Sequence, residues 1–486
     1  VNYKTASSYT VSQIDTTAPT LTLTGSTTIT IKKGETYTEP GYSATDTGGS
    51  GMNGSVVVSG TVNNTSVGTY TLTYTAKDNA GNITTKTRTI KVIDNEYDVA
   101  KGVNYPLLAP GMTPIKWNGS TWVNTTENDS EWYDYNNKKW ANAKTADGSM
   151  WVWIPRYIYK ITSGWHIGVT GKIEVQFSKG TNDNWNSSTI GNIDTRMNAE
   201  ASNNSWTNHP AFAFGSDQLT GFWVAKFEAS GTTGAVNSLP NVNAISGIKV
   251  GDAFDASRNM ETNSRYGWGT TGNGIDTHLT KNIEWGAVAY LSKSVYGKNN
   301  DEIWINNSIE LITGCAGNSV APDSYNGCQN AYHTTNGIKA STTGTIYGVY
   351  DMAGGVREYV AAYVENDHGN LNNYGNSIYT AHNKYKDVYI NTHQPYYIFF
   401  LSVDHKGDAV YETGGYHQQY FVNSWYNDYS SIPHESEPWF WRSGFYYSSQ
   451  ENSHAGIFQF GKGSGVGSGG GSIFGFRPVI AVGAGL

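Results

Sequence analysis

The sequence predicts a multidomain chain in which a β-sandwich precedes a larger α+β domain. With 486 residues, the chain is too long for one compact core. Up to residue 94, short segments alternate apolar residues with threonine, and turn residues separate them at even spacing. After Gly102 tryptophan becomes frequent and the apolar runs lengthen. We therefore place the sandwich at 15–94, a linker at 95–101 and the α+β domain at 102–486.

The overall composition excludes several classes of protein. Charged residues make up 15% of the chain and aromatic residues 13%, whereas disordered chains carry much charge and few aromatics. The net charge is −8 and no cluster of lysine and arginine occurs, so nucleic acid is not an expected partner. No run of 18 apolar residues is found, and we expect no membrane insertion. Because the first residue is Val1 rather than methionine, the lack of a signal peptide carries no weight.

The predicted sandwich consists of short strands joined by turns. Residues 1–14 resemble the end of an upstream repeat or a linker, and Asp15–Pro19 is a polar boundary. Apolar alternation then predicts strands at Leu21–Leu23, Ile29–Ile31, Val56–Val58, Tyr70–Tyr74 and Ile90–Ile93. No helical period appears between them. Since this region has no cysteine pair, its apolar faces alone must hold the two sheets together.

Four motifs in the sandwich carry a family resemblance. They are Thr17–Pro19, Gly41–Asp46, Gly68–Tyr70 and Ala76–Asn82. Together they resemble the bacterial Ig-like repeats of surface proteins and phage structural proteins. The resemblance implies a spacer or an adhesive stalk, and nothing in the segment suggests catalysis.

Strands predominate in the second domain, and about two helices accompany them. Met150–Ile161 is a strong strand pattern in which Pro155 indicates an edge strand or a bulge. Gly221–Glu228, Pro395–Val403 and Phe474–Val482 are further predicted strands. The clearest helix is predicted at Glu284–Val295, where five residues fall on one face: Trp285, Val288, Ala289, Ser292 and Val295.

The two cysteines, Cys315 and Cys328, lie 13 residues apart in a segment rich in glycine, proline and asparagine. A local disulfide and two free thiols are equally compatible with this spacing. The nearest histidine, His333, has no partner at the short spacing that a zinc site needs, so no metal is expected there.

Five segments of the second domain occur in the order found in a known group of proteins. They are Gly221–Glu228, Ile283–Gly297, Tyr347–Val360, Phe440–Gly444 and Gly475–Ile480. They are similar to the formylglycine-generating-enzyme group of C-type-lectin-like folds, which implies a C-type-lectin-like α+β domain. The oxidases of that group carry a cysteine pair near their C-terminal end, and this chain has none there. We therefore expect no catalytic residues and no enzymatic activity.

The same resemblance bears on a calcium site. Gly355 stands where members of the group usually carry a calcium-binding asparagine, and Arg357 replaces the usual aromatic residue. Glu358, the other implied ligand, is retained. We therefore expect no cofactor, since calcium, the ion implied by the resemblance, lacks one of its usual ligands.

The stretch Pro438–Val482 places tyrosine, serine, asparagine and glycine between two apolar ends. Tyrosine offers a large contact at low entropic cost, and the small polar residues adapt their hydrogen bonds. A glycine-rich surface loop without a role has the same composition. The stretch is similar to the variable region of proteins diversified by diversity-generating retroelements, in which adenine-directed mutagenesis rewrites selected codons of a C-type-lectin-like domain.

This second resemblance implies a set of variable residues and a fixed frame. The implied ligand-binding residues are Trp441, Phe445, Tyr446, Tyr447, Ser448, Ser449, Asn452, Ser453, His454, Gln459, Gly461, Gly463, Ser464, Gly465 and Ser468. The implied frame comprises Trp439, Arg442, Gly444, Ala455, Gly456, Phe458, Phe460 and Phe476–Val479. We expect residues 445–449 and 452–454 to form one exposed patch. Phe458 and Phe460 alternate and should point inward.

Two functions remain open. The first is a hypervariable ligand-binding protein that displays its variable surface on an Ig-like stalk. The second is a fixed adhesin or glycan-binding lectin without diversification. Both imply a protein or glycan ligand on a cell surface and an extracellular location, on a bacterial surface or a phage virion.

A further segment has two possible roles. Trp425–Tyr429 is either a second binding loop or a packed strand crossing.

Overall fold

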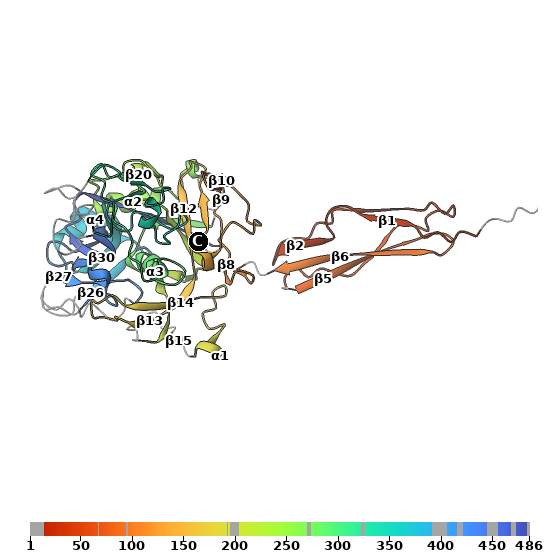
Figure 1. Ribbon diagram of the computed structural model, residues 1–486, viewed down its shortest axis with the longest axis horizontal. Helices are drawn as coiled ribbons and strands as arrows, with labels where there is room; N and C mark the ends of the chain where they lie inside the picture. The colour runs from red at the N-terminus through yellow and green to blue at the C-terminus, as the bar shows by residue number, and fades with distance from the viewer. Residues whose placement is uncertain are drawn as a thin grey trace, which may run out of the picture. The chain divides into compact units, whose positions relative to one another are not determined.

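The computed structural model divides into two compact units, Val1–Asp98 and Val99–Leu486, which are described separately (Figure 1). It describes residues 14–66, 68–93, 96–191, 193–194, 204–269, 274–321, 326–390, 406–415, 421–444, 455–467 and 473–483. The division falls inside the segment expected to be a linker. Strands predominate among the described residues of both units.

The N-terminal unit is a sandwich of two small sheets. Its strands are β1 (Thr20–Leu23), β2 (Thr28–Lys32), β3 (Tyr42–Thr45), β4 (Val57–Ser59), β5 (Gly68–Lys77) and β6 (Ile83–Ile93). β1 pairs with β3, and the second sheet has the order β2-β6-β5-β4. Leu21 of β1 shares one core with Leu72, Tyr74 and Ile90 of the other sheet. Alternating apolar residues thus close the sandwich, as predicted.

A buried arginine joins the loops at one end of this sandwich. Arg88 is fully buried, and its guanidinium donates to the carbonyl oxygens of Ser26, Thr24 and Gly41 at 2.8–3.2 Å. It also pairs with Glu39 at 3.3 Å. Polar contacts therefore supplement the apolar core of a unit that has no disulfide.

Three sheets form the frame of the C-terminal unit. The largest has the order β10-β9-β11-β12-β19-β32-β22, a second has β14-β13-β16-β15, and a third has β26-β25-β29-β30 with β31 beside β25. The bounds of the first are β9 (Thr113–Trp117), β10 (Trp122–Asn124), β11 (Asn142–Lys144), β12 (Met150–Pro155), β19 (Gly221–Ala225), β22 (Ile275–Leu279) and β32 (Pro478–Val482). Those of the other two are β13 (Tyr157–Ser163), β14 (Lys172–Phe177), β15 (Ile193–Asp194), β16 (Trp206–Asn208), β25 (Arg357–Glu365), β26 (Asp387–Ile390), β29 (Trp439–Gly444), β30 (Ala455–Gly463) and β31 (Phe474–Phe476).

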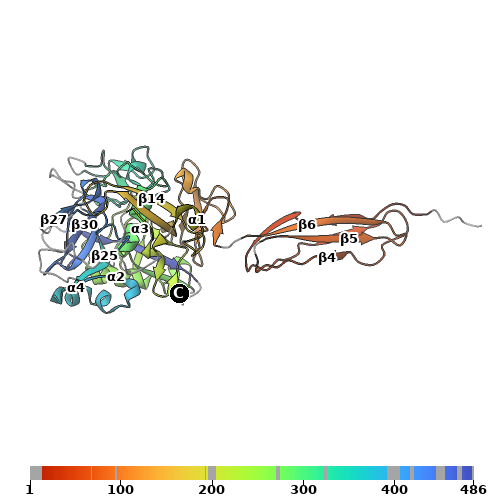
Figure 2. The same ribbon diagram turned by 90° about the horizontal axis from the view of Figure 1, so that it is seen from below.

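Helices and short strands complete the described fold. The helices are α1 (Ser187–Ile190), α2 (Val250–Asn259), α3 (Asn282–Lys293) and α4 (Gly369–Thr380). The 3-10 turns are Tyr135–Asn137, Pro210–Phe212, Ser264–Tyr266, Gly337–Ala340, Asn383–Tyr385 and Trp425–Asn427. The short strands are β7 (Tyr97–Asp98), β8 (Val103–Asn104), β17 (Ala213–Phe214), β18 (Asp217–Gln218), β20 (Ser230–Thr232), β21 (Ala235–Asn237), β23 (Cys315–Ala316), β24 (Asn330–Ala331), β27 (Phe421–Asn423) and β28 (Tyr429–Ser431). In two perpendicular views α2 and α4 lie together at the end of the unit that carries β25 and β30 (Figures 1 and 2).

The structure corrects two predicted elements. The strand expected at Met150–Ile161 is two strands, β12 and β13, which belong to different sheets. Between them Arg156 forms a buried ion pair with Asp183 at 2.7 Å. The helix expected to reach Val295 ends at Lys293, and Val295 is exposed rather than part of the apolar face. The strand predicted at Pro395–Val403 lies outside the described residues.

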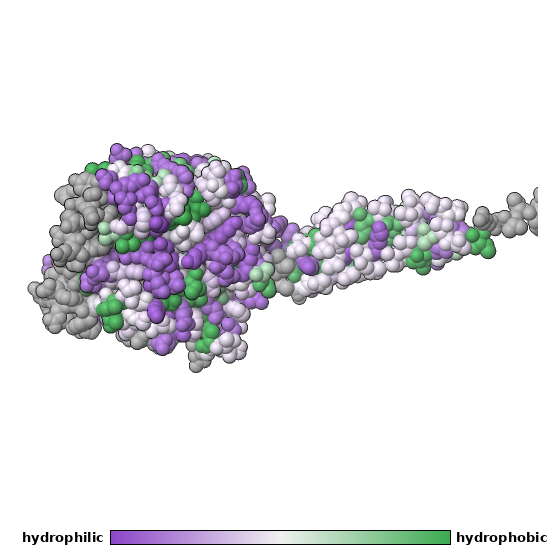
Figure 3. All heavy atoms as spheres, viewed as in Figure 1, coloured by the Kyte–Doolittle hydropathy of each residue, from purple (hydrophilic) through white to green (hydrophobic). Residues whose placement is uncertain are grey.

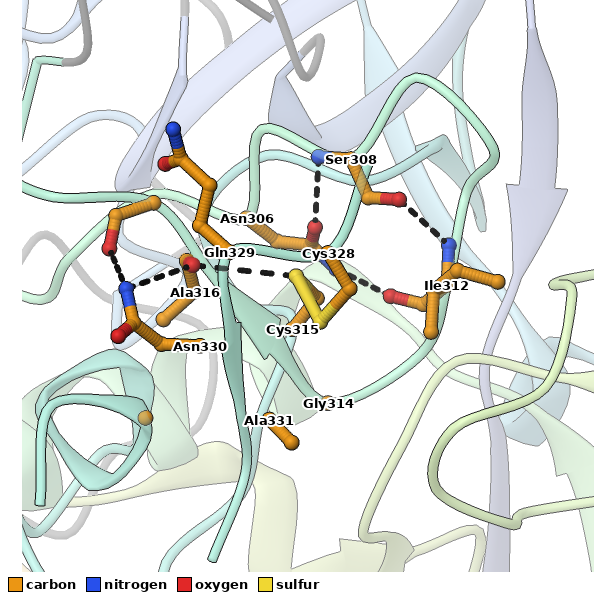
Figure 4. Close-up of a disulfide and its surroundings, with 12 residues drawn as sticks. Asn306, Ser308, Ile312, Gly314, Cys315, Ala316, Cys328, Gln329, Asn330 and Ala331 are labelled. Atoms are coloured by element: carbon orange, nitrogen blue, oxygen red, sulfur yellow. Dashed lines mark hydrogen bonds between the residues drawn. A yellow bond between two sulfur atoms is a disulfide. The ribbon is translucent and has the colours of Figure 1, made fainter. Parts of the chain in front are cut away.

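The two cysteines form a disulfide, which resolves the alternative that the sequence left open (Figure 4). Cys315 is buried in β23, which pairs with β24 beyond Cys328. Asn330 donates from Nδ2 to the carbonyl oxygens of Ala316 and Gly317 at 3.3 and 2.8 Å. The disulfide and these bonds tie the two ends of the segment 315–331 together.

The surface of the C-terminal unit is predominantly polar on the face seen in Figure 3, where hydrophobic residues appear in small separate groups. Within the described part of the chain, no helix is both long and apolar enough to cross a membrane.

Candidate functional site

The strand pair β29–β30 brackets the residues that the sequence singles out for binding. Trp439 pairs with Gly463, Trp441 with Gly461, and Gly444 with Ala455, in antiparallel register. Residues 445–454 therefore connect two strand ends that are hydrogen-bonded to each other. The predicted ligand-binding residues of this connection lie outside the described residues: Phe445, Tyr446, Tyr447, Ser448, Ser449, Asn452, Ser453 and His454.

The end of β29 has an irregular backbone at Ser443 and is anchored there by hydrogen bonds. Ser443 has a positive φ of 73°, an uncommon conformation for a residue other than glycine, and the register shifts there. Its hydroxyl donates to the carbonyl oxygens of Gly354 at 2.7 Å and Asp351 at 3.1 Å. The N–H of Gly354 donates back to the Ser443 carbonyl at 3.1 Å. These contacts hold the last residues of β29 against the segment Asp351–Gly355.

The start of β30 is anchored by side chains from two other elements. The indole N–H of Trp285, on α3, donates to the Ile457 carbonyl at 2.7 Å. Asp428 accepts from the Phe458 N–H at 3.0 Å, and Ser430 accepts from the Phe460 N–H at 3.1 Å. Because β30 is the last strand of its sheet, these two side chains occupy donors that would otherwise form an open edge.

Asp428 leaves no room for a side chain at Gly456. A Cβ there would lie 2.1 Å from both carboxylate oxygens of Asp428, which is fully buried. Its Oδ1 has no hydrogen-bond partner in the part of the chain that the structure describes. Burial, and secondly the nearby Glu302 carboxylate, raise the pKa of Asp428 well above its ordinary value.

A second group of titratable side chains lies beside Asp428. Burial raises the pKa of Glu302 to about 7 and lowers the pKa of Lys293 to about 8. The Lys293 ammonium donates to the Tyr426 hydroxyl at 2.9 Å. The Tyr426 ring packs against Phe458 with centroids 5.9 Å apart. Through Tyr426 this cluster packs against the first residues of β30. Sequence reasoning missed it because its members come from three distant segments.

The segment Trp425–Tyr429 is mainly a packed crossing. Trp425 and Asp428 are buried, Tyr426 and Tyr429 are half-buried, and Asn427 is exposed. Trp425 donates from its indole nitrogen to the Gly164 carbonyl at 2.9 Å. Of the two alternatives left open by the sequence, the packing role fits this segment, apart from Asn427.

Several implied ligand-binding residues are buried in the described structure, contrary to the expectation of an exposed surface. Trp441 is 7% exposed and donates to the Lys462 carbonyl at 2.8 Å, and Gln459 is 1% exposed and donates to the Tyr429 carbonyl at 2.9 Å. Gly461, Gly463 and Gly465 are buried as well. Side chains on both faces of β30 are therefore buried, whereas only Phe458 and Phe460 were expected to point inward.

The three glycines are packing residues. A Cβ at Gly461 would lie 2.0 Å from the Trp441 ring, and a Cβ at Gly465 would lie 2.8 Å from the Trp439 ring. A Cβ at Gly463 would lie 3.0 Å from the Tyr359 hydroxyl. Ser464 is half-buried, and Ser468 lies outside the described residues. In contrast, five residues of the implied frame, Trp439, Arg442, Phe458, Phe460 and Phe476, are fully buried.

Glu358, implied as a calcium ligand, is engaged by an arginine. Arg477 donates from Nε and Nη2 to the two carboxylate oxygens of Glu358 at 3.0 and 2.7 Å, and both residues are buried. Arg477 also donates to the carbonyl oxygens of Ala225 and Tyr350 at 2.8 and 3.0 Å. At Gly355, a Cβ would lie 2.3 Å from a carboxylate oxygen of Glu228. The motif therefore joins β19, β25 and the last strands through a buried ion pair.

The N-terminal unit holds a group of acids that the sequence did not single out. Carboxylate oxygens of Asp15, Asp46 and Asp78 lie within 4.8 Å of one another, a spacing that could hold a metal ion. Each also accepts backbone N–H groups, for example from Thr17, Gly48 and Asn82 at 2.8–2.9 Å. The signal was present in three turn motifs, but their proximity depends on the fold.

Comparison with known families assigns the N-terminal unit. Residues 21–92 match the family model described as bacterial surface protein, Ig-like domain. The N-terminal unit is a bacterial surface Ig-like domain. The match covers the strands β1 to β6 of this Ig-like domain, in agreement with the resemblance carried by its turn motifs. No curated protein matches the sequence.

Solved structures give weaker similarities. They include the lipoprotein BT2262 from Bacteroides thetaiotaomicron, at 18% identity and a TM-score of 0.16 over 46% of this chain and 77% of that one. They also include CBM51-2 in complex with GlcNAc and INT domains from Clostridium perfringens ZmpB, at 13% identity and a TM-score of 0.15 over 29% of this chain and 31% of that one. TM-scores of this size show no shared fold.

Proposed function

We propose that the protein is a ligand-binding protein of a bacterial surface, in which residues 445–454 contact the ligand and the Ig-like domain serves as a spacer. The C-terminal unit would be a C-type-lectin-like domain, and its binding residues would be diversified by a retroelement. The Ig-like domain supports the surface location. The binding partner would be a protein or glycan on another cell.

The observation that carries the proposal is the closed frame of β29 and β30. Gly444 and Ala455 pair directly, and Ser443, Ile457 and Phe458 are bonded to residues of other segments. The frame thus has anchors that do not depend on the side chains of 445–454. Substitutions within the connection can then change recognition while the core that carries it is retained.

The composition of the connection supports binding rather than catalysis. It holds Phe445, Tyr446 and Tyr447 followed by small polar residues, a mixture typical of adaptable binding loops. Both cysteines of the chain are joined in the disulfide, so neither supplies the free thiol that the oxidases of the resembling group require. We therefore propose that the unit has no oxidase activity and needs no cofactor.

Alanine substitutions at Tyr446 and Tyr447 test the binding role, with Phe458→Ala as the matched aromatic control. Ligands are first sought with the full chain on glycan arrays and on displayed surface-protein libraries. Each tyrosine variant should lose about 2 kcal/mol of binding and change stability by no more than about 0.5 kcal/mol. Phe458→Ala should cost about 3 kcal/mol or more of stability because Phe458 is fully buried. Tyrosine variants that unfold like Phe458→Ala would refute the proposal.

Diversification has a separate genomic test. A near-copy of the codons for residues 439–482, differing mainly at adenines and lying beside a reverse-transcriptase gene, is the expected finding. Absence of that copy, together with retained binding at Tyr446 and Tyr447, would instead identify a fixed adhesin. Binding confined to glycans would point to a lectin.

A further inference from the structure

His278 lies between two carboxylates inside the C-terminal unit. Its Nδ1 is 3.0 Å from Oδ1 of Asp276, and its Nε2 is 2.8 Å from Oε1 of Glu284. The ring is fully buried and stacks on Phe214 with centroids 4.9 Å apart. Asp276 and His278 belong to β22, and Glu284 belongs to the first turn of α3. The imidazole therefore bridges an edge strand of the seven-stranded sheet to the start of a helix.

The two short contacts bear on the protonation state of this ring. A neutral imidazole has one N–H and one lone pair, whereas an ionised carboxylate only accepts. With a neutral ring, one nitrogen lone pair would face a carboxylate oxygen at 2.8 or 3.0 Å. Burial opposes the charge of both acids, but His278, together with Arg258 at Asp276 and Lys281 at Glu284, holds the pKa of each acid at about 2. Two donors are needed, and only the imidazolium has them.

The surrounding charges are arranged around the same three groups. Asp276 accepts from Arg258 Nη1 at 2.7 Å and Tyr385 at 2.7 Å, and Lys384 lies 3.3 Å away. Glu284 accepts from the Lys281 N–H at 2.9 Å, and the Lys281 ammonium lies 3.3 Å away. Two further charged groups join this network: Glu261, which pairs with Arg258, and Asp387, which accepts from the Ile283 N–H.

We infer that His278 is held as an imidazolium between Asp276 and Glu284 and that its proton latches β22 to the start of α3. Loss of the proton loosens this junction as the pH rises. Burial disfavours the charge, but Glu284 and Asp276 together outweigh it and raise the pKa of His278 above its ordinary value near 6.5. The latch is then complete below about pH 6.5, and its contribution to stability is lost as the pH rises through the raised folded-state pKa.

The latch lies next to the frame of the candidate site. Glu284 is followed by Trp285, whose indole N–H donates to Ile457 at the start of β30. Loosening the first turn of α3 would therefore weaken an anchor of the connection 445–454. This consequence for binding depends on the proposed function, whereas the latch itself does not.

The experiment reads the proton directly and needs no ligand. The full chain is labelled with ¹⁵N-histidine, and the ring nitrogens of His278 are assigned by their loss in His278→Gln. Both nitrogens should show the chemical shifts of an imidazolium at pH 7, and they should titrate above the ordinary value. A neutral ring at pH 6 would overturn the inference. If His278→Gln fails to fold, Asp276→Asn provides the assignment, since it should move the same resonance to a lower titration point.

Urea unfolding between pH 6 and 9 gives the independent test. In the window above about pH 6.5, the wild-type folding constant should fall faster than that of His278→Gln, by up to about tenfold per pH unit. His333→Gln, at an exposed histidine, is the matched control and should leave the wild-type slope unchanged. Equal slopes for wild type and His278→Gln would overturn the latch. If the wild-type pH dependence is as expected but the full chain binds no ligand on the arrays and libraries, the proposed function would be wrong and the latch would stand.

Discussion

Adding one methyl group at Gly461 should destabilise the C-terminal unit, whereas the same change at Gly463 should be nearly neutral. Both glycines lie on β30, two residues apart, and neither has a positive φ, so alanine strains the backbone at neither position. The difference between them is the space around Cβ. At Gly461 the new carbon would lie 2.0 Å from Cζ2 of Trp441, and at Gly463 it would lie 3.0 Å from the Tyr359 hydroxyl.

The cost at Gly461 follows from these contacts. Two carbon atoms pack best at about 3.5–4.0 Å, so the Trp441 ring must retreat by roughly 1.5 Å. The ring is held by its hydrogen bond to the Lys462 carbonyl, which contributes about 1 kcal/mol. Overpacking of a dense core typically costs a further ~1–3 kcal/mol. We therefore expect Gly461→Ala to lose about 2–4 kcal/mol of unfolding free energy, and Gly463→Ala less than about 1 kcal/mol.

Urea unfolding followed by tryptophan fluorescence measures this difference. All 16 tryptophans lie at or beyond Trp117, so the signal reports the C-terminal unit and not the Ig-like domain. Far-UV circular dichroism confirms that each variant starts folded. A Gly461→Ala variant within about 0.5 kcal/mol of wild type, the range of exposed sites, would show that β30 faces open space. The packing account would then be wrong, and diversification could extend along the strand.

Three further predictions concern buried groups, each measured by the same unfolding assay. Arg477→Met should cost about 3–5 kcal/mol because it leaves Glu358 buried without its cation, and Glu358→Gln should cost a similar amount because it leaves Arg477 buried without its anion. Cys315→Ser should cost about 3 kcal/mol, since the bridge to Cys328 closes a short loop; a reductant should lower wild-type stability equally and leave the variant unchanged. Burial raises the pKa of Glu412 to about 7. The contribution of Glu412 to the unfolding free energy is therefore complete below pH 4.5, its ordinary pKa, and is lost as the pH rises through 7. Glu412→Gln should flatten this fall of stability with pH, and an unchanged slope would contradict the prediction.

The sequence predicted the Ig-like domain more fully than the C-terminal unit. Its strands alternate strictly, and Leu72, Tyr74 and Ala76 are buried on one face as the period of two requires. The strand Tyr42–Thr45 was missed because it is short and mostly exposed, so it has no apolar pattern. The helix at Asn282–Lys293 was found from its period, but its end was not, because the apolar Val295 continues the pattern beyond the last helical turn.

For the candidate site, the sequence predicted the frame residues but not the residues that hold them. The frame was implied by the family resemblance, and the burial of Phe458 and Phe460 followed from alternation. The partners of the frame could not be found this way: Trp285 and Asp428 are far apart in sequence and meet only at β30. A buried carboxylate that caps an edge strand has no local signature, and Asp428 therefore looked like one polar residue of a loop.

The role of the glycines in the C-terminal stretch was the hardest feature to predict from the sequence. A glycine-rich composition suits a flexible loop and a tightly packed strand equally well. In β29 the indole rings of Trp439 and Trp441 are met by glycines from other segments: Gly375 of α4 and Gly465 at Trp439, and Gly461 at Trp441. Each Cβ would enter the ring, so a glycine-rich sequence is what lets large aromatic residues pack in this sheet. It follows that variation compatible with the fold should be confined to 445–454 and excluded from Gly456, Gly461 and Gly465. An alignment of natural variants that showed tyrosine or asparagine at Gly461 would contradict this division.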